Sequence, residues 1–145
     1  MPKKKTIQQA RKDAREGKAP TTQAGEFVRE EMEHIRQGKH GARSTKQAIA
    51  IGLSKARRAG VDLPAPKPGR TSESTRKQAE RDLAKGQSRQ GQKKVSAKRS
   101  RAVRTALKRE SREAASPRAL SKQARSAAQA RRKRGTVTPA KAFHA

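Results

Sequence analysis

The chain has few side chains that could fill a hydrophobic core. Of its 145 residues, 18 are apolar and larger than alanine, and only Phe27 and Phe143 are aromatic. Leu, Ile, Val and Phe number 16, well below the roughly 20 % under which a highly charged chain is expected to be disordered. We therefore do not expect one compact domain of this length.

The charge balance narrows the functional classes further. Lys and Arg number 39 against 12 Asp and Glu, a net charge of +27. An enzyme needs an apolar, water-excluding pocket, which this composition cannot line. No cysteine, no membrane-length apolar run and no signal-peptide pattern are present. We expect an intracellular, non-enzymatic protein without membrane contact or small-molecule substrate, whose partner is a polyanion, DNA or RNA.

A proline-rich stretch divides the chain into two halves of unequal charge. Residues 1–64 carry a net charge of +8 and residues 65–145 carry +19. We divide the chain into an N-terminal arm with a short charged helix that has nothing to bury (1–20), a helical hairpin (21–63), a stiff linker (64–70) and a basic tail (71–145). The expected fold class is mostly α, a small hairpin followed by an extended, largely disordered tail, with no sheet.

Local signals define the hairpin. The first helix is expected over residues 23–37 and ends before Gly38. The second helix is expected to begin at the capping box of Ser44 and Gln47 and to end at Gly60. Gly52 offers a flat spot where another helix could approach. The predicted facing residues are Phe27, Val28, Met32 and Ile35 against Ile49, Ile51, Leu53 and Val61. Such a core is marginal, so a homodimer through the hairpin is also expected.

The tail contains three stretches that can form helices. They run from Thr71 or Ser72 to Lys85, from Ser96 to about Arg112, and from Ser116 to Arg134. Each has at most two large apolar residues, so core packing is not expected of them. We expect these helices to form chiefly when nucleic acid neutralises their charge.

Phosphate contacts are predicted in both halves of the chain. The start of the second hairpin helix combines exposed amides with cations, and a second basic group lies near that helix's end. The predicted hairpin contacts are Lys39, Arg43, Ser44, Thr45, Lys46, Lys55, Arg57 and Arg58. The predicted tail contacts are Lys98, Arg99, Arg101, Arg104, Lys108, Arg109, Arg118, Lys122, Arg125, Arg131, Arg132, Lys133 and Arg134.

Three histidines were considered as metal ligands. Glu31 and His34 have the Glu-x-x-His spacing of metal sites in helical bundles, but the other expected helices supply no matching ligands. His40 is expected in a loop close to phosphate. We therefore predict no metal and no other cofactor.

The choice of polyanion depends on aromatic residues. Proteins that read RNA or single strands usually stack bases on aromatic side chains, and this chain has no Tyr or Trp. Double-stranded DNA, bound without strong sequence preference, is the expected partner. An RNA-binding or ribosome-associated factor and a protein-interaction module of a plasmid-maintenance system remain the alternatives.

Two stretches of the hairpin resemble a known family. Residues 25–31 (GEFVREE) and 38–54 (GKHGARSTKQAIAIGLS) look like a family of small basic bacterial proteins of uncharacterised function, sometimes labelled DNA-binding or plasmid-stabilisation proteins. The tail is similar in composition to histone H1-like bacterial proteins. The resemblance implies a bacterial, cytoplasmic protein, placed in the nucleoid by the DNA-binding hypothesis, and implies no activity.

Overall fold

Six α-helices and one short 3₁₀ helix form the part of the chain that the computed structural model describes, residues 2–88 and 96–137. These residues contain no strand. The helices are α1 (Lys4–Arg15), α2 (Pro20–Arg36), α3 (Thr45–Arg58), α4 (Glu73–Gln87), α5 (Ala97–Lys108), the 3₁₀ helix η1 (Glu113–Ala115) and α6 (Pro117–Val137).

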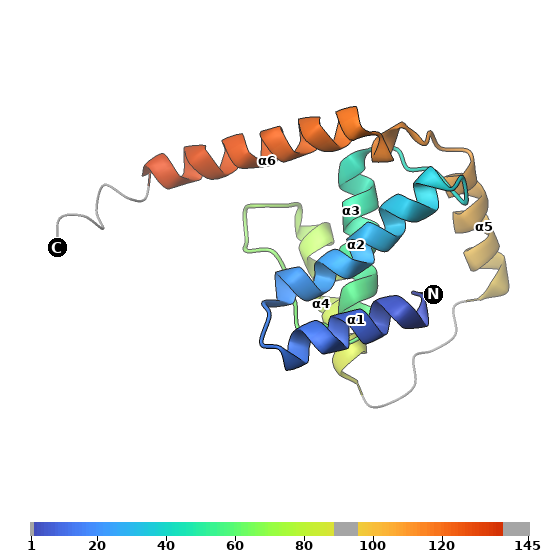
Figure 1. Cartoon of the computed structure of the whole chain (residues 1–145), viewed down its shortest axis with the longest axis horizontal. Coiled ribbons are helices and arrows are strands. Elements are labelled where there is room, and N and C mark those ends of the chain that lie inside the picture. The colour runs from blue at the N-terminus through green and yellow to red at the C-terminus, as the bar shows by residue number, and fades with distance from the viewer. Residues whose placement is uncertain (1, 89–95, 138–145) are drawn as a thin grey trace.

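The helices α2 and α3 cross at the centre of the molecule (Figure 1). Helix α1 packs on α2, and α4 packs on α3. The 3₁₀ helix contacts both central helices, and α6 contacts η1 and α3. Beyond these contacts α6 extends away from the body, and α5 lies at the opposite edge (Figure 1).

The prediction of a largely disordered tail is wrong. Helices α4, α5, η1 and α6 occupy most of residues 73–137. Parts of the tail also enter the core: Ala79 is 5 % exposed, Ala114 is 5 % exposed and Ala115 is 1 % exposed. The prediction failed because it counted only large apolar side chains, whereas alanine lets helices pack closely enough to exclude water.

The core consists of two clusters built from a few large side chains and many alanines. In one cluster, Phe27 of α2 packs with Val61, Leu63 and Ala56, and with Ala10 of α1. Helix α1 therefore has an apolar face to bury, contrary to our expectation from its sequence.

The second core cluster joins the hairpin to the tail. Met32 and Ile35 of α2 pack with Ala42 and Ala48, and with Ala114 and Ala115 of η1. Val28, Ile49 and Leu120 pack around this cluster. These faces of the hairpin are thus covered by other segments of the same chain; the homodimer through the hairpin stays a prediction.

Capping interactions define both ends of α3. The Ser44 Oγ accepts a hydrogen bond from the Gln47 amide at 3.1 Å, as predicted. The Gln47 side chain accepts from the Arg43 amide instead of completing the capping box on Ser44. At the other end, Gly60 has a φ of +104° and the Val61 amide bonds to the Ala56 carbonyl at 3.0 Å. This confirms the predicted Schellman end of the helix.

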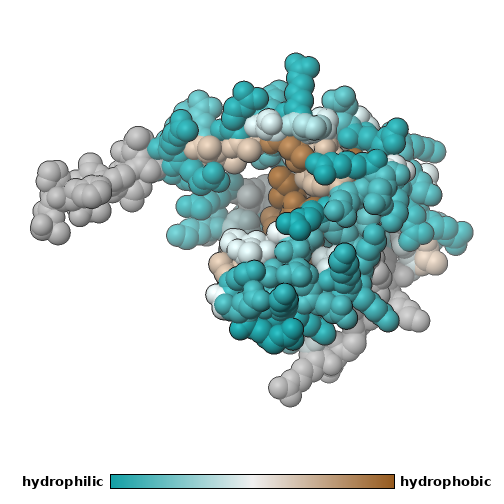
Figure 2. Space-filling view, viewed as in Figure 1, coloured by the Kyte–Doolittle hydropathy of each residue, from teal (hydrophilic) through white to brown (hydrophobic). Residues whose placement is uncertain are grey.

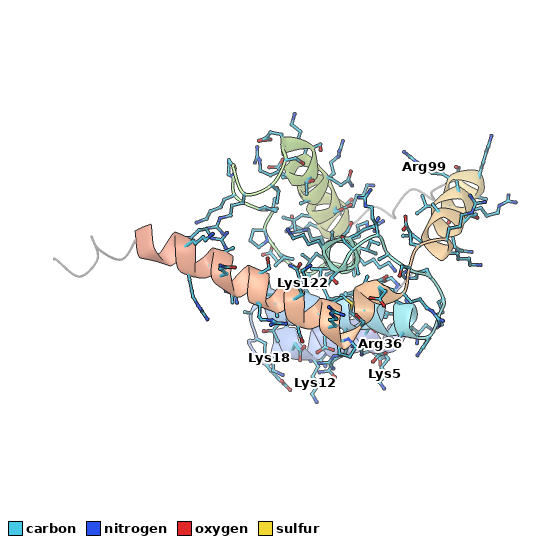
Figure 3. The ribbon with its side chains drawn as sticks, turned by 90° about the horizontal axis from the view of Figure 1, so that it is seen from above. Lys5, Lys12, Lys18, Arg36, Arg99 and Lys122 are labelled. Atoms are coloured by element: carbon cyan, nitrogen blue, oxygen red, sulfur yellow. The ribbon has the colours of Figure 1, made fainter. Side chains whose placement is uncertain are left out.

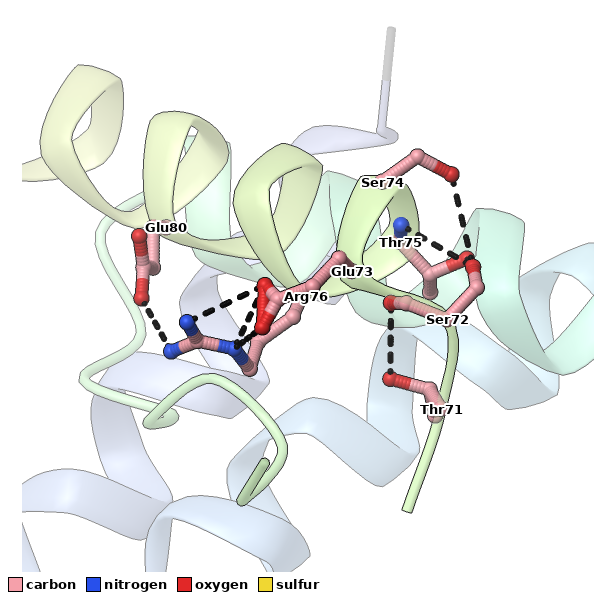
Figure 4. Close-up of polar contacts among 7 residues, drawn as sticks. All are labelled: Thr71, Ser72, Glu73, Ser74, Thr75, Arg76 and Glu80. Atoms are coloured by element: carbon pink, nitrogen blue, oxygen red, sulfur yellow. Dashed lines mark hydrogen bonds and ion pairs between the residues drawn. The ribbon is translucent and has the colours of Figure 1, made fainter. Parts of the chain in front are cut away.

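Helix α4 begins at a serine cap and neutralises much of its own charge. Ser72 Oγ accepts from the Thr75 amide at 3.3 Å (Figure 4). The Arg76 guanidinium lies between Glu73 and Glu80, at 3.0 and 2.9 Å (Figure 4). Because acidic residues alternate with its cations, α4 differs from the two helices that follow it.

Candidate nucleic-acid interface

Helices α5 and α6 carry cations and no acidic residue. All their Lys and Arg side chains are exposed to solvent. Figure 3 shows Arg99 on α5 at the edge of the molecule and Lys122 on α6. These helices contain the predicted contacts Lys98, Arg99, Arg101, Arg104, Lys108, Arg118, Lys122, Arg125, Arg131, Arg132, Lys133 and Arg134, and Arg109 is the C-cap of α5. The structure thus places every predicted tail contact on a solvent-facing surface.

One face of α6 forms a straight line of cations. Arg118, Lys122, Arg125 and Arg132 are separated by four, three and seven residues, so they lie on the same side of the helix. We call these four residues the α6 stripe. It spans 14 residues, about 21 Å at 1.5 Å per residue, which is long enough to follow several phosphates of one duplex strand.

The opposite face of α6 fixes the helix to the body. Leu120 packs around the core cluster of Met32 and Ile35. The Ser116 Oγ caps the helix by accepting from the Ala119 amide at 3.1 Å. The α6 stripe therefore faces away from the core.

Backbone contacts join α5 to the hairpin loop. The Gly41 amide bonds to the Leu107 carbonyl at 2.8 Å, and the Ala42 amide bonds to the Ser111 carbonyl at 3.0 Å. A Cβ on Gly41 would lie 2.0 Å from the Glu110 carbonyl oxygen, so only glycine permits this approach. The contact brings the loop from residue 37 to residue 44 and the C-terminal end of α5 to one edge of the molecule.

The predicted hairpin contacts fall into two groups. Lys39, Arg43, Ser44 and Lys46 are exposed beside the start of α3. Ser44 also caps its own helix, so its hydroxyl is already engaged.

The second group of predicted hairpin contacts has partners within the chain. The Thr45 hydroxyl donates to the Ala114 carbonyl at 2.7 Å. Lys55 pairs with Glu31, and Arg58 lies 3.8 Å from Asp82. We therefore exclude Thr45, Lys55 and Arg58, together with Arg57, from the proposed contacts.

Arg57 holds the segment that follows α3. Its Nε donates to the Leu63 carbonyl and its Nη2 donates to the Pro64 carbonyl, each at 3.1 Å. The residue is 7 % exposed. Burial lowers the pKa of the Arg57 guanidinium, and Asp82 partly opposes this; the group still stays protonated at neutral pH.

Replacing Arg57 with methionine is expected to reduce stability and to leave DNA affinity nearly unchanged. The change leaves two carbonyls without donors, which costs about 1–3 kcal/mol in the free energy of unfolding. The matched variant Arg43→Gln alters an exposed cation, so it should weaken DNA binding and change stability by about 0.5 kcal/mol or less. Urea unfolding and fluorescence anisotropy with a DNA duplex measure the two effects. Weaker DNA binding by Arg57→Met at unchanged stability would contradict this assignment.

The fold buries carboxylates more than cations. Asp13, Glu30, Glu31 and Asp82 are at most 5 % exposed, whereas Arg57 is the one buried cation among the described residues. Burial raises the pKa of Asp13, but hydrogen bonds from Lys18 and Gln9 outweigh this and lower it. Since acidic groups are removed from the surface, the exposed surface is more positive than the composition alone implies.

Glu31, His34 and His40 form a cluster that was not predicted from the sequence. One donor atom from each residue lies within 4.8 Å of those of the other two. Glu31 is buried, and both histidines are mostly buried. Burial lowers the pKa of His34; the carboxylates of Glu31 and Glu30 oppose this shift. The Glu-x-x-His spacing was a signal, but the third residue comes from the loop and could not be located from the sequence.

A groove of about 930 Å³ lies between α3 and α4 and reaches α5 and α6. Ile51, expected in the core, lines this groove together with Val103 and Leu107 of α5. Figure 2 shows apolar surface in the hollow below α6 and hydrophilic surface around it. Lys46 and Arg81 are among the cations that line it.

Comparison with known proteins gives a family for the N-terminal part only. Residues 4–67 match a family described as "Family of unknown function (DUF6496)". The match covers α1, α2, α3 and the segment after α3, in agreement with the expected uncharacterised family. No curated protein and no solved structure matches the chain.

In residues 2–88 and 96–137, every helix is too short or too polar to cross a bilayer.

Proposed function

We propose that this protein is a non-enzymatic, sequence-tolerant DNA-binding protein that acts by neutralising phosphates. The proposal depends chiefly on α5 and α6, whose 33 residues include 12 cations and no acidic residue, with every cation exposed. Lys39, Arg43 and Lys46 of the hairpin add cations beside the start of α3. Since the family resemblance implies a bacterium, the proposed location is the nucleoid.

The placement of aromatic and acidic residues supports duplex DNA as the partner. Phe27 is 1 % exposed, so it offers no surface on which a base could stack. Single-strand and RNA readers generally depend on such stacking. Glu30 and Glu31 of α2 are buried, so they do not compete with DNA for the exposed cations.

Salt concentration is expected to control the affinity strongly. If 6 to 10 phosphates are contacted, the affinity for a random-sequence duplex should fall by about 10³ to 10⁵ between 50 and 200 mM salt, because counterions released from DNA drive binding. A fluorescence anisotropy titration of the full chain at several salt concentrations measures this. A flat salt dependence would overturn the proposal.

Competition separates the proposed function from its main alternative. The protein is first bound to a labelled DNA duplex. Unlabelled duplex DNA or structured RNA, at equal phosphate concentration, is then added to displace the labelled duplex. The proposal expects DNA to compete at least as well as RNA. Preferential displacement by RNA would instead favour an RNA-binding or ribosome-associated factor.

A further inference from the structure

The cluster of Glu31, His34 and His40 has the donor groups of a transition-metal site. Glu31 and His34 lie one turn apart on α2, and His40 comes from the loop that follows. The donor atoms lie within 4.8 Å of one another. Two imidazoles and one carboxylate leave a further position for water, a combination that Zn²⁺ and related divalent ions accept.

In its neutral form, the His40 ring turns a nitrogen lone pair towards an oxygen lone pair of Glu31. The Nδ1 of His40 lies 2.8 Å from the Gly41 carbonyl oxygen, which can only accept, so Nδ1 carries the proton. In the neutral ring, Nε2 then presents its lone pair to Glu31 Oε2 at 3.1 Å. A cation between these two atoms would turn an unfavourable contact into two coordinate bonds.

A buried ring nitrogen of His34 also has no hydrogen-bond partner. This nitrogen is Nε2, and the Oε2 of Glu30 is likewise buried without a hydrogen bond. Glu30 is 5 % exposed, so water does not readily compensate for this loss. An ion held by the Nδ1 of His34 would polarise the ring and strengthen an Nε2–H contact to Glu30.

Each histidine has a carbonyl or carboxylate oxygen near the nitrogen that points away from the cluster centre, at hydrogen-bond distance for His40 but not for His34. His40 Nδ1 faces the Gly41 carbonyl, and His34 Nε2 lies 3.6 Å from Glu30 Oε1. The Lys3 amide in turn donates to Glu30 Oε1 at 2.8 Å. Histidines that bind metals almost always have such an acceptor at the second nitrogen, which fixes the ring orientation.

We propose that Glu31, the Nδ1 of His34 and the Nε2 of His40 bind one divalent transition-metal ion of the Zn²⁺ class. The Lys55 ammonium group, which pairs with Glu31, must move away; its side chain is 23 % exposed, so it can reach solvent. The ion links the hairpin loop to α2. The same loop is joined to α5 by the hydrogen bond from the Gly41 amide to the Leu107 carbonyl. The proposed role of the ion is to hold the loop in place, and this role does not depend on the proposed DNA binding.

The test is zinc titration of the full chain, without an affinity tag and after chelator treatment, by isothermal calorimetry at neutral pH. One Zn²⁺ per chain is expected. Variants His34→Gln and His40→Gln should each lose at least about 100-fold in affinity, since even changes to groups behind the ligands cost 10–100-fold. His144→Gln, the third histidine, lies outside the described residues and serves as the matched control that retains binding.

Three further measurements keep the test decisive where a histidine variant fails to fold. Circular dichroism shows whether each variant keeps the helical content of the parent, and Lys55→Met should bind Zn²⁺ at least as tightly because it removes a competing cation. Co²⁺ added to the unaltered chain should give the visible absorption bands of a low-coordinate site containing nitrogen. The proposal is overturned if the parent binds no Zn²⁺ and shows no such bands, or if a folded His34→Gln/His40→Gln variant binds as the parent does.

Discussion

Replacing the α6 stripe with glutamine is expected to reduce the salt dependence of DNA binding. With Arg118, Lys122, Arg125 and Arg132 changed together, four of the proposed phosphate contacts are removed. The slope of log affinity against log salt should therefore become shallower by about 3 to 4. Glutamine favours helix as well as lysine does, so α6 should keep its structure. Anisotropy titrations of both chains over a range of salt concentrations measure the two slopes.

A second quadruple variant separates local contacts from net charge. Lys4, Lys5, Lys12 and Arg15 are exposed cations of α1, which lies on the other side of the central helices from α6 (Figure 1). Changing these four to glutamine removes the same charge and should alter the slope far less. An equal change of the slope in both variants would mean that total charge alone determines binding and that α6 has no special role.

The second large effect is expected at Gly52, where α2 and α3 approach each other closely. A Cβ on Gly52 would lie 2.7 Å from Val28 Cα and 2.9 Å from Val28 Cγ2. Because backbone atoms of α2 cannot yield without moving the helix, Gly52→Ala should lower the free energy of unfolding by about 1–3 kcal/mol. Urea unfolding followed by circular dichroism measures the change.

Gly25 provides the matched control in the facing helix. A Cβ there meets no atom within 4 Å, and the residue lies inside α2. Gly25→Ala should therefore raise stability by about 0.5–1 kcal/mol through helix propensity alone. If Gly52→Ala is as stable as Gly25→Ala, the close crossing of α2 and α3 is not rigid.

Local sequence signals predicted helix ends better than they predicted packing. The cap at Ser44, the glycine end at Gly60 and the flat spot at Gly52 each depend on residues close together in the chain, and the structure contains all three. The position of Ala114 and Ala115 in the core depends on contacts with residues about 70 positions earlier. No periodicity in the tail could indicate that contact.

The same limit applies to the functional residues. Exposure of cations on α5 and α6 could be anticipated, because these helices have hardly any large apolar residue. The burial of Arg57 could not be anticipated. Its partners are the backbone carbonyls of Leu63 and Pro64, and because every residue has a carbonyl, the sequence does not indicate which ones are used. The meeting of His40 with Glu31 depends on how the loop folds back on α2, and this in turn depends on the contact of Gly41 with α5.

Helix α6 is attached near its N-terminal end, where Leu120 packs against the core. Its C-terminal part extends beyond the body of the molecule (Figure 1). Mutations of exposed residues on that part therefore carry little penalty in folding. Under the proposed function, affinity for a polyanion and stability of the fold would consequently be determined by different residues. Selection could then add or remove charge along α6, and so change the strength of the proposed binding, without altering the alanine-rich core.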